Sequence, residues 1–265
     1  GSCSRSDGET IYMKYKVTLA YDGSEFLGWQ KQSSERSVQE ELETILSKIA
    51  KEEVRVHGSG RTDAKVHALA QTCHFESDVD MDHHAWRRAL NALVPKDIYI
   101  KLVQRVNHEF HAQYHTLSKT YEYRLNQGEY NPFMRNYVYQ YGKKLDTQAI
   151  RDLMKIFVGT HDFTSFNATE LTVVENQVRT IEWFNLNEED DLLIFRIKGS
   201  GFLRYMVRML IAACIEVGRG KLSVEDVNDM LLKKDKRAFA RNAEPCGLYM
   251  CEVEYEEGWI EDESI

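Results

Sequence analysis

Hydrophobic and polar residues alternate along four short segments in the first part of the chain. These segments cover residues 14–21, 53–58, 70–76 and 98–106. A period of two is typical of β-strands, whereas apolar residues three or four positions apart at 37–50 and 82–94 predict amphipathic helices. Ser37 and Glu40 have the spacing of an N-terminal capping box for the first helix. The order strand, helix, strand, strand, helix, strand is ferredoxin-like.

The second half of the chain repeats this order with insertions. The predicted strands lie near residues 120–126, 137–142, 178–186, 192–198 and 247–255. The predicted helices cover residues 146–157, 202–217 and an additional segment, 223–234. We therefore expect an α+β protein of two ferredoxin-like halves, with adjoining, mainly antiparallel sheets and a central active-site cleft between them.

Domain boundaries follow from the same pattern. Residues 1–13 are an N-terminal extension whose Gly1 and Ser2 are typical of an expression remnant, 14–112 are the first half and 113–255 the second. No Pro/Gly/Ser-rich linker separates the halves, which favours one continuous two-lobed unit. Residues 256–265 form an acidic tail, and such charged termini are usually solvated.

Composition excludes several classes of protein. No apolar run approaches the roughly 20 residues of a membrane span, and residues 1–13 lack the apolar centre of a secretory signal. Five scattered cysteines without a C-x-x-C pair argue against a disulfide framework, and the nine histidines form no familiar zinc motif. We expect a reducing, cytoplasmic location, no metal and no membrane association.

The formal net charge of −8 is concentrated at the chain ends. Residues 252–265 contain seven acidic residues and no Lys or Arg, and residues 1–13 add a single net negative charge. The body between them is neutral, and a neutral body can still present a basic face to nucleic acid. Acidity therefore does not exclude an RNA partner.

Asp63 stands out in the segment 58-GSGRTDAKVHA-68, between Arg61 and Lys65. One interpretation is a turn, because the surrounding Gly, Ser and Thr residues are turn formers and Asp often bonds its own backbone. The other is a nucleophile or general base, whose charge neighbouring cations would maintain.

Two further pairs of residues carry potential chemistry. Arg204 and Arg208 lie four positions apart in the apolar segment 202–218 and would share one face of the predicted helix. A buried guanidinium needs a carboxylate or phosphate, so a core ion pair and a functional site are both open. Tyr121 and Tyr123 share a face of their predicted strand, where each could be a core ring or a phenol facing the cleft.

Taken in chain order, these segments resemble the tRNA pseudouridine synthases of the TruA type. The resemblance covers nearly the whole chain. It rests on 21-YDGSEFLGWQ-30, 37-SVQEELE-43, 60-GRTDAKVHA-68, 110-FHA-112, 119-KTYEY-123, 159-GTHDFTSF-166, 202-FLRYMVR-208 and 247-GLY-249.

The resemblance implies roles for individual residues. Asp63 would be the catalytic carboxylate, Arg208 its paired arginine, and Tyr121 the active-site tyrosine and candidate proton acceptor. The implied substrate-binding residues are Arg61, which helps to extrude the target nucleotide, and Leu248 in the pocket. The cations Arg204 and Lys65 are further candidates for binding the RNA, because Lys and Arg suit phosphate contacts.

The resemblance also implies a reaction and its partners. The expected activity is isomerisation of uridine to pseudouridine in the anticodon stem-loop of tRNA, without cofactor or metal, by a homodimer whose subunits together bind the tRNA. The target base must leave its stack before it can react.

Three positions depart from the family pattern. Lys65 stands where glycine is usual, and a positive φ there would cost lysine about 1 kcal/mol. Gln113 replaces an arginine, which removes one expected RNA contact, and Met209 replaces an asparagine that would support Arg208.

Two other functions remain open from the residues alone. One is a tRNA-binding protein or folding helper without turnover, although Asp63, Tyr121 and Arg208 are all retained. The other is a carboxylate-dependent hydrolase that would use Asp63 with a second acid such as Asp22 or Asp162.

Overall fold

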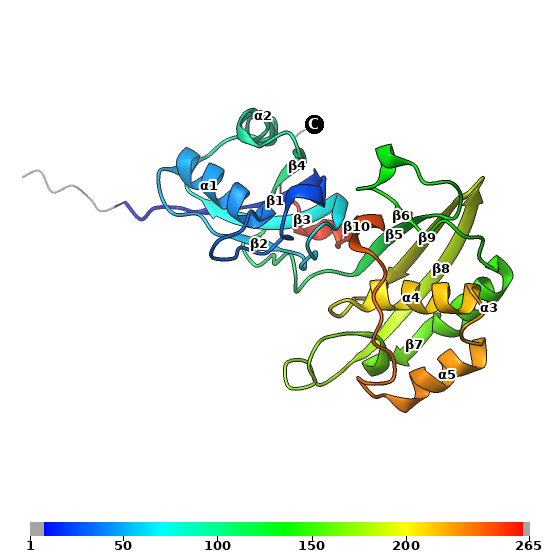
Figure 1. Ribbon diagram of the computed structural model, residues 1–265. Helices are drawn as coiled ribbons and strands as arrows, with labels where there is room; N and C mark the ends of the chain where they lie inside the picture. The colour runs from blue at the N-terminus through cyan, green and yellow to red at the C-terminus, as the bar shows by residue number, and fades with distance from the viewer. Residues whose placement is uncertain (1–7, 262–265) are drawn as a thin grey trace, which may run out of the picture.

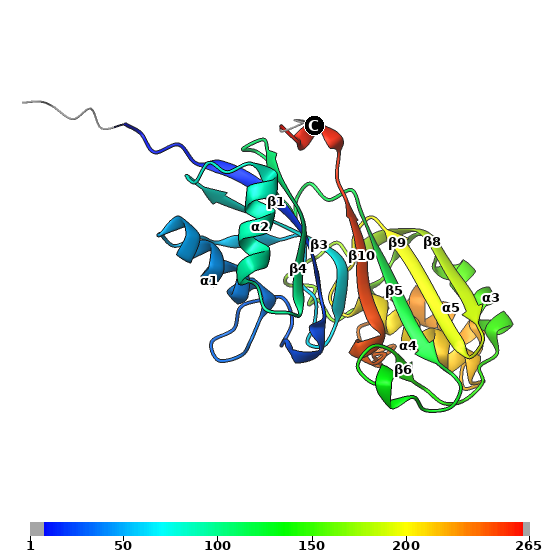
Figure 2. The same cartoon turned by 90° about the horizontal axis from the view of Figure 1, so that it is seen from above.

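A computed structural model describes residues 8–261, and it joins both halves of the chain in one twisted sheet (Figures 1 and 2). Within these residues the sheet has ten strands, and its main path runs β4-β1-β3-β10-β5-β9-β8-β7. The strands are β1 (Met13–Tyr21), β2 (Val56–Gly58), β3 (His67–Ser77), β4 (Ile98–Val106), β5 (Ser118–Asn126), β6 (Tyr139–Gln140), β7 (Gly159–Asp162), β8 (Val178–Glu189), β9 (Leu192–Gly199) and β10 (Leu248–Glu254).

Helices lie along both parts of the sheet (Figure 1). Polar side chains cap the first turn of most of them. The helices are α1 (Val38–Ala50), α2 (His83–Leu93), α3 (Thr147–Phe157), α4 (Met206–Gly218) and α5 (Val224–Lys233). Ser37 caps α1 by accepting a hydrogen bond from the Glu40 backbone N–H. The reciprocal pair of a full capping box forms instead at Ser223 and Asp226 of α5. Among the described helices, none is both long and apolar enough to cross a membrane.

Each half has the strand order of a ferredoxin-like unit, which confirms the predicted fold class. The first half is ordered β4-β1-β3-β2 and the second β10-β5-β9-β8. The halves do not keep separate sheets, because Tyr249 and Met250 of β10 pair in parallel with His67 and Ala68 of β3. The boundary between residues 112 and 113 stays a prediction, since the sheet is continuous across the halves.

The second long helix of the second half begins later than its apolar pattern predicts. It was expected from residue 202, but α4 begins at Met206, after Tyr205 takes a left-handed backbone conformation with φ 62°. Arg204 therefore precedes the helix and is exposed. The prediction that Arg204 and Arg208 share a helix face was wrong, because a left-handed residue ends the helical path between them.

The acidic tail is not simply a solvated end. Trp259 packs on Phe110 with ring centroids 5.9 Å apart, and Ile260 forms a bridge with Val106 at the end of β4. Apolar residues inside the tail thus anchor residues 256–261 to the first half. Residues 262–265 and the extension residues 1–7 lie outside the described residues.

Candidate active site

A cleft of about 1140 Å³ opens between the two halves and is lined by residues of both. Six of the seven predicted site residues line it: Arg61, Asp63, Tyr121, Arg204, Arg208 and Leu248. Lys65 does not line the cleft, and its side chain is exposed outside it. The fold thus brings predicted site residues that are up to 187 positions apart, Arg61 and Leu248, into one cleft.

The loop that carries Asp63 is held by the β1–α1 segment. The Trp29 N–H donates to the Thr62 carbonyl at 3.1 Å, and the Thr62 hydroxyl bonds the Tyr21 hydroxyl at 2.7 Å. Gly28, with φ 89°, allows this approach, because a Cβ there would lie 2.6 Å from the Thr62 oxygen. Lys65 has φ 68°, so the backbone conformation expected from the usual glycine is present.

Asp63 and Arg208 form an ion pair across the cleft. The Arg208 guanidinium donates to Asp63 Oδ2 at 3.1 Å, and the Arg208 side chain is 13% exposed and that of Asp63 28%. Burial raises the pKa of Asp63 above its ordinary value, while Arg208 and then Arg204 oppose this rise. The carboxylate is therefore more basic than a solvated aspartate, and Arg208 favours its ionised form.

Arg208 has a second anchor in the second half. Its Nε donates to the Ala243 carbonyl at 2.8 Å, and the Ala243 N–H donates back to the Arg208 carbonyl at 3.1 Å. Met209, where the resemblance leads us to expect an asparagine, is buried in the core. The segment around Ala243 thus orients the guanidinium.

Tyr121 and Tyr123 lie on one strand but have different surroundings. Tyr121 is buried at the cleft wall, in edge contact with Phe202 at 5.3 Å between ring centroids. Tyr123 belongs to the core, and its hydroxyl donates to the Glu244 carbonyl at 2.7 Å. Burial raises the pKa of Tyr121, so its phenol is neutral near pH 7.

The order of these parts matches a known family. Residues 18–115 and 153–256 match the family described as tRNA pseudouridine synthase. The chain belongs to this family. It is 42% identical to tRNA pseudouridine synthase A of Exiguobacterium sp. over 92% of this chain and 98% of that protein. It is 43% identical to tRNA pseudouridine synthase A 1 of Bacillus cereus over 91% of this chain and 98% of that protein.

A similarity to solved structures is much weaker. A chain titled "Crystal Structure of a Cbf5-Nop10-Gar1 Complex" aligns with a TM-score of 0.33 and 14% identity. The alignment covers 76% of this chain and spans only 45% of that one.

Lys119 is a cleft residue that the sequence interpretation did not single out. Its Nζ donates to the Ser59 carbonyl at 2.8 Å, just before the Asp63 loop. A Cβ on Gly60 would lie 2.3 Å from this Nζ, so the glycine makes room for the ammonium. Burial lowers the pKa of Lys119 to about 8. Its spacing of two from Tyr121 on a strand was the available signal, because alternate strand residues share a face.

The second acids that a hydrolase would need have structural roles outside the cleft. Asp22 accepts bonds from the Ser24 backbone N–H at 3.0 Å and from the Tyr137 hydroxyl at 2.5 Å. Asp162 accepts from the backbone N–H and the hydroxyl of Thr164. Neither lines the cleft, so the geometry does not favour a hydrolase with two carboxylates.

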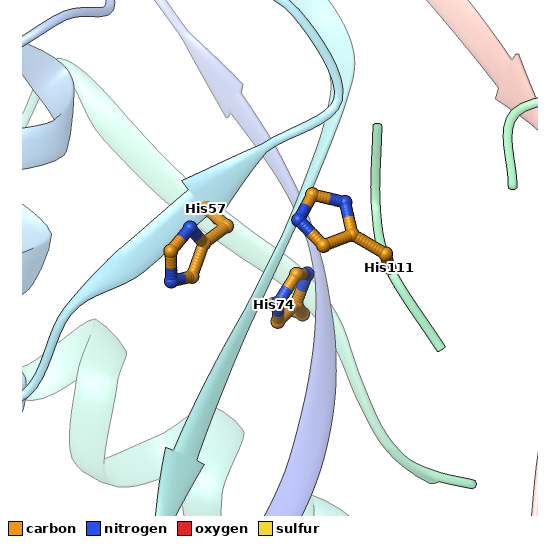
Figure 3. Close-up of side chains that lie close together, drawn as sticks. All are labelled: His57, His74 and His111. Atoms are coloured by element: carbon orange, nitrogen blue, oxygen red, sulfur yellow. The ribbon is translucent and has the colours of Figure 1, made fainter. Parts of the chain in front are cut away.

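Three histidines form a cluster that the sequence did not predict. His57, His74 and His111 place one ring nitrogen each within 4.8 Å of one another (Figure 3). His74 Nδ1 accepts from the Ala112 N–H and His111 Nδ1 from the Gln113 N–H, so the remaining nitrogen of each neutral ring carries its proton. A histidine that binds a metal through one ring nitrogen normally donates a hydrogen bond from the other. In His74 and His111 the other nitrogen, Nδ1, accepts a hydrogen bond, so these two residues do not fit a metal site.

Proposed function

We propose that this chain isomerises uridine to pseudouridine in the anticodon stem-loop of tRNA. The observation that carries the proposal is the Asp63–Arg208 ion pair, which joins the two halves inside the cleft. Family membership supports the reaction class, and the names of the relatives support tRNA as the substrate.

The reaction requires few groups from the protein. The bond from N1 to the sugar breaks, a bond from C5 to the same sugar carbon forms, and the ring exchanges its C5 proton for one on N1. There is no net oxidation or reduction. We assign to Asp63 the carboxylate that assists departure of uracil, and to Arg208 the cation that holds this carboxylate ionised and oriented.

We assign to Tyr121 and Leu248 the wall against which the extruded base packs. The raised pKa keeps the Tyr121 hydroxyl protonated. This hydroxyl could therefore accept a proton from the substrate only if it released its own proton at the same time. Tyr121→Phe retains the ring and removes the hydroxyl. An unchanged single-turnover rate in this variant would eliminate proton transfer through Tyr121.

Cations around the cleft supply RNA affinity in this proposal. Arg61, Arg204 and Lys119 line the same cleft as Asp63 and suit phosphate contacts. Lys65 lies outside it, so a contact between Lys65 and RNA would have to involve a more distant part of the tRNA. We also propose a cytoplasmic homodimer, as the family resemblance implies. Light scattering of the purified protein tests the dimer independently of activity.

The proposed function is tested by mapping pseudouridine at single-nucleotide resolution on unmodified tRNA transcripts. Wild type should give signal in the anticodon stem-loop, and Asp63→Ala should give none while binding tRNA within a few-fold of wild type. Asp162→Asn is the matched control, because it neutralises an acid outside the cleft. Tight binding by the wild-type protein without pseudouridine on any transcript would favour the tRNA-binding protein instead.

A further inference from the structure

An exposed aromatic ring lies at the cleft beside the histidine cluster. Tyr114 is 75% exposed, and one face of its ring stacks on His111 with centroids 4.0 Å apart and an angle of 21° between the planes. Both residues line the cleft that contains Asp63. A ring covered on one face only leaves the other face available to a flat partner.

The support beneath Tyr114 is fixed by backbone hydrogen bonds. His111 Nδ1 accepts from the Gln113 and Tyr114 N–H groups, at 3.1 and 3.4 Å. His111 packs edge-on against the buried His74 at 4.7 Å, and His57 stacks on the same ring at 4.9 Å (Figure 3). These four residues, His57, His74, His111 and Tyr114, are called the aromatic ledge below.

The ledge suits a base better than a phosphate. Burial lowers the pKa of His111, and burial with the neighbouring histidines and Lys14 lowers that of His74 to about 3. Both rings are therefore uncharged at neutral pH, whereas phosphate contacts require cations or aligned N–H donors. A neutral ring with an open face is the usual platform for an unpaired nucleobase.

We propose that the open face of Tyr114 stacks an unpaired base of the tRNA substrate, at a position other than the target uridine. This inference rests on the proposed function for the identity of the RNA. It rests on the ledge itself for the site: an exposed ring, preorganised by His111, in the same cleft as the catalytic acid.

The first test measures binding and turnover of the isolated anticodon stem-loop. Tyr114→Ala should raise the dissociation constant about 5- to 150-fold, the range expected for one lost stacking contact. Tyr114→Phe should bind like wild type, and kcat should change less than two- to threefold in both variants. Phe133→Ala is the control, since Phe133 is 85% exposed but does not line the cleft.

The second test identifies the stacked nucleotide. Each unpaired position of the stem-loop is replaced in turn by an abasic nucleotide, and binding to wild type and Tyr114→Ala is compared. At one position the two proteins should bind equally, because the partner of Tyr114 is gone. The proposal is overturned if Tyr114→Ala and wild type bind the intact stem-loop equally. It is also overturned if Tyr114→Ala binds more weakly than wild type at every abasic position. Binding is read without turnover, so these outcomes judge the ledge even if no pseudouridine forms.

Discussion

The two halves share one strand order but support their site residues differently. In the first half, Asp63 lies on a loop where Lys65 has φ 68° and is exposed. In the second half, Arg208 lies in the first turn of α4, an almost wholly buried helix that packs against α3. The ion pair therefore joins an acid on a strained loop to a cation on a buried core element. We expect the buried partner to determine the geometry of the pair.

Among the variants that compare the two halves, the largest effect should come from removing the buried partner, Arg208. Arg208→Gln should lower kcat by about 10²- to 10³-fold, the usual cost of losing a positioned charge or donor in an active site. The pKa of Asp63 is already raised by burial, and Arg208 opposes that rise. Its loss should raise the pKa further, so the acidic limb of kcat/KM should move to higher pH.

A pH–rate profile measures both changes in Arg208→Gln. Arg208→Lys is the matched control, because it keeps the charge near Asp63 but loses the fork that also bonds Ala243. The lysine variant should keep the acidic limb close to that of wild type while remaining slow. An unmoved limb in Arg208→Gln would contradict the electrostatic role.

A smaller effect should appear where Lys119 of the second half contacts the loop of the first. Burial lowers the pKa of Lys119 to about 8, so the unfolded chain binds more protons than the folded one between about pH 8 and the ordinary lysine pKa of about 10.4. Relative to Lys119→Met, wild type should therefore gain about 1–3 kcal/mol of unfolding free energy as pH rises through this window.

Urea unfolding of both proteins at pH 7, 9 and 10.5 tests the Lys119 prediction. Only the difference between the proteins matters, because other lysines titrate in both. Lys144→Met is the control for an exposed lysine and should show no such difference. Parallel pH profiles for wild type and Lys119→Met would show that the ammonium is not buried in solution.

The smallest effect should come from relieving the strained loop. Lys65→Gly should raise the unfolding free energy by about 0.5–1 kcal/mol, since glycine tolerates a positive φ. For a protein of this size that corresponds to a rise of about 2 °C in Tm. Activity on the stem-loop should stay unchanged, because Lys65 lies outside the cleft.

Tyr205→Gly gives the corresponding change in the second half. Tyr205 also has a positive φ, of 62°, but its ring lies 4.6 Å from the Arg204 guanidinium and 5.2 Å from that of Arg208. This variant should lose activity despite the relieved backbone. If Lys65→Gly and Tyr205→Gly behave alike, the contrast between the halves is wrong.

Much of the fold was readable from periodicity, because strands and amphipathic helices repeat at distinct intervals. The predicted strand at 98–106 coincides with β4, and the predicted helix at 146–157 with α3 and its cap, Asp146. The start of α4 was missed because Tyr205 is an aromatic residue in a left-handed conformation, which apolar spacing does not reveal. The sheets of the two halves were expected to adjoin, but the pairing of β10 with β3 was not predicted, since pairing between distant strands leaves no local signal.

The candidate site was predicted less evenly. Arg61, Asp63, Tyr121, Arg204, Arg208 and Leu248 do line one cleft. Their grouping came from the family resemblance, because no spacing rule connects residues so far apart. The histidine cluster was missed because His57, His74 and His111 come from β2, β3 and a loop. Only the register of β2 with β3, which places His57 opposite His74, brings the first two together.

The two halves of the sheet meet where β10 pairs with β3, so the protein could be divided into two fragments at this junction. A fragment of residues 14–112 would end with one edge of β3 bare where β10 now pairs, and a fragment of 113–261 would bear the complementary edge on β10. Neither piece could hold Asp63 against Arg208. Mixed together, the two pieces have matching edges and could reassemble, so the chain is a candidate for a split enzyme whose activity reports the meeting of its parts.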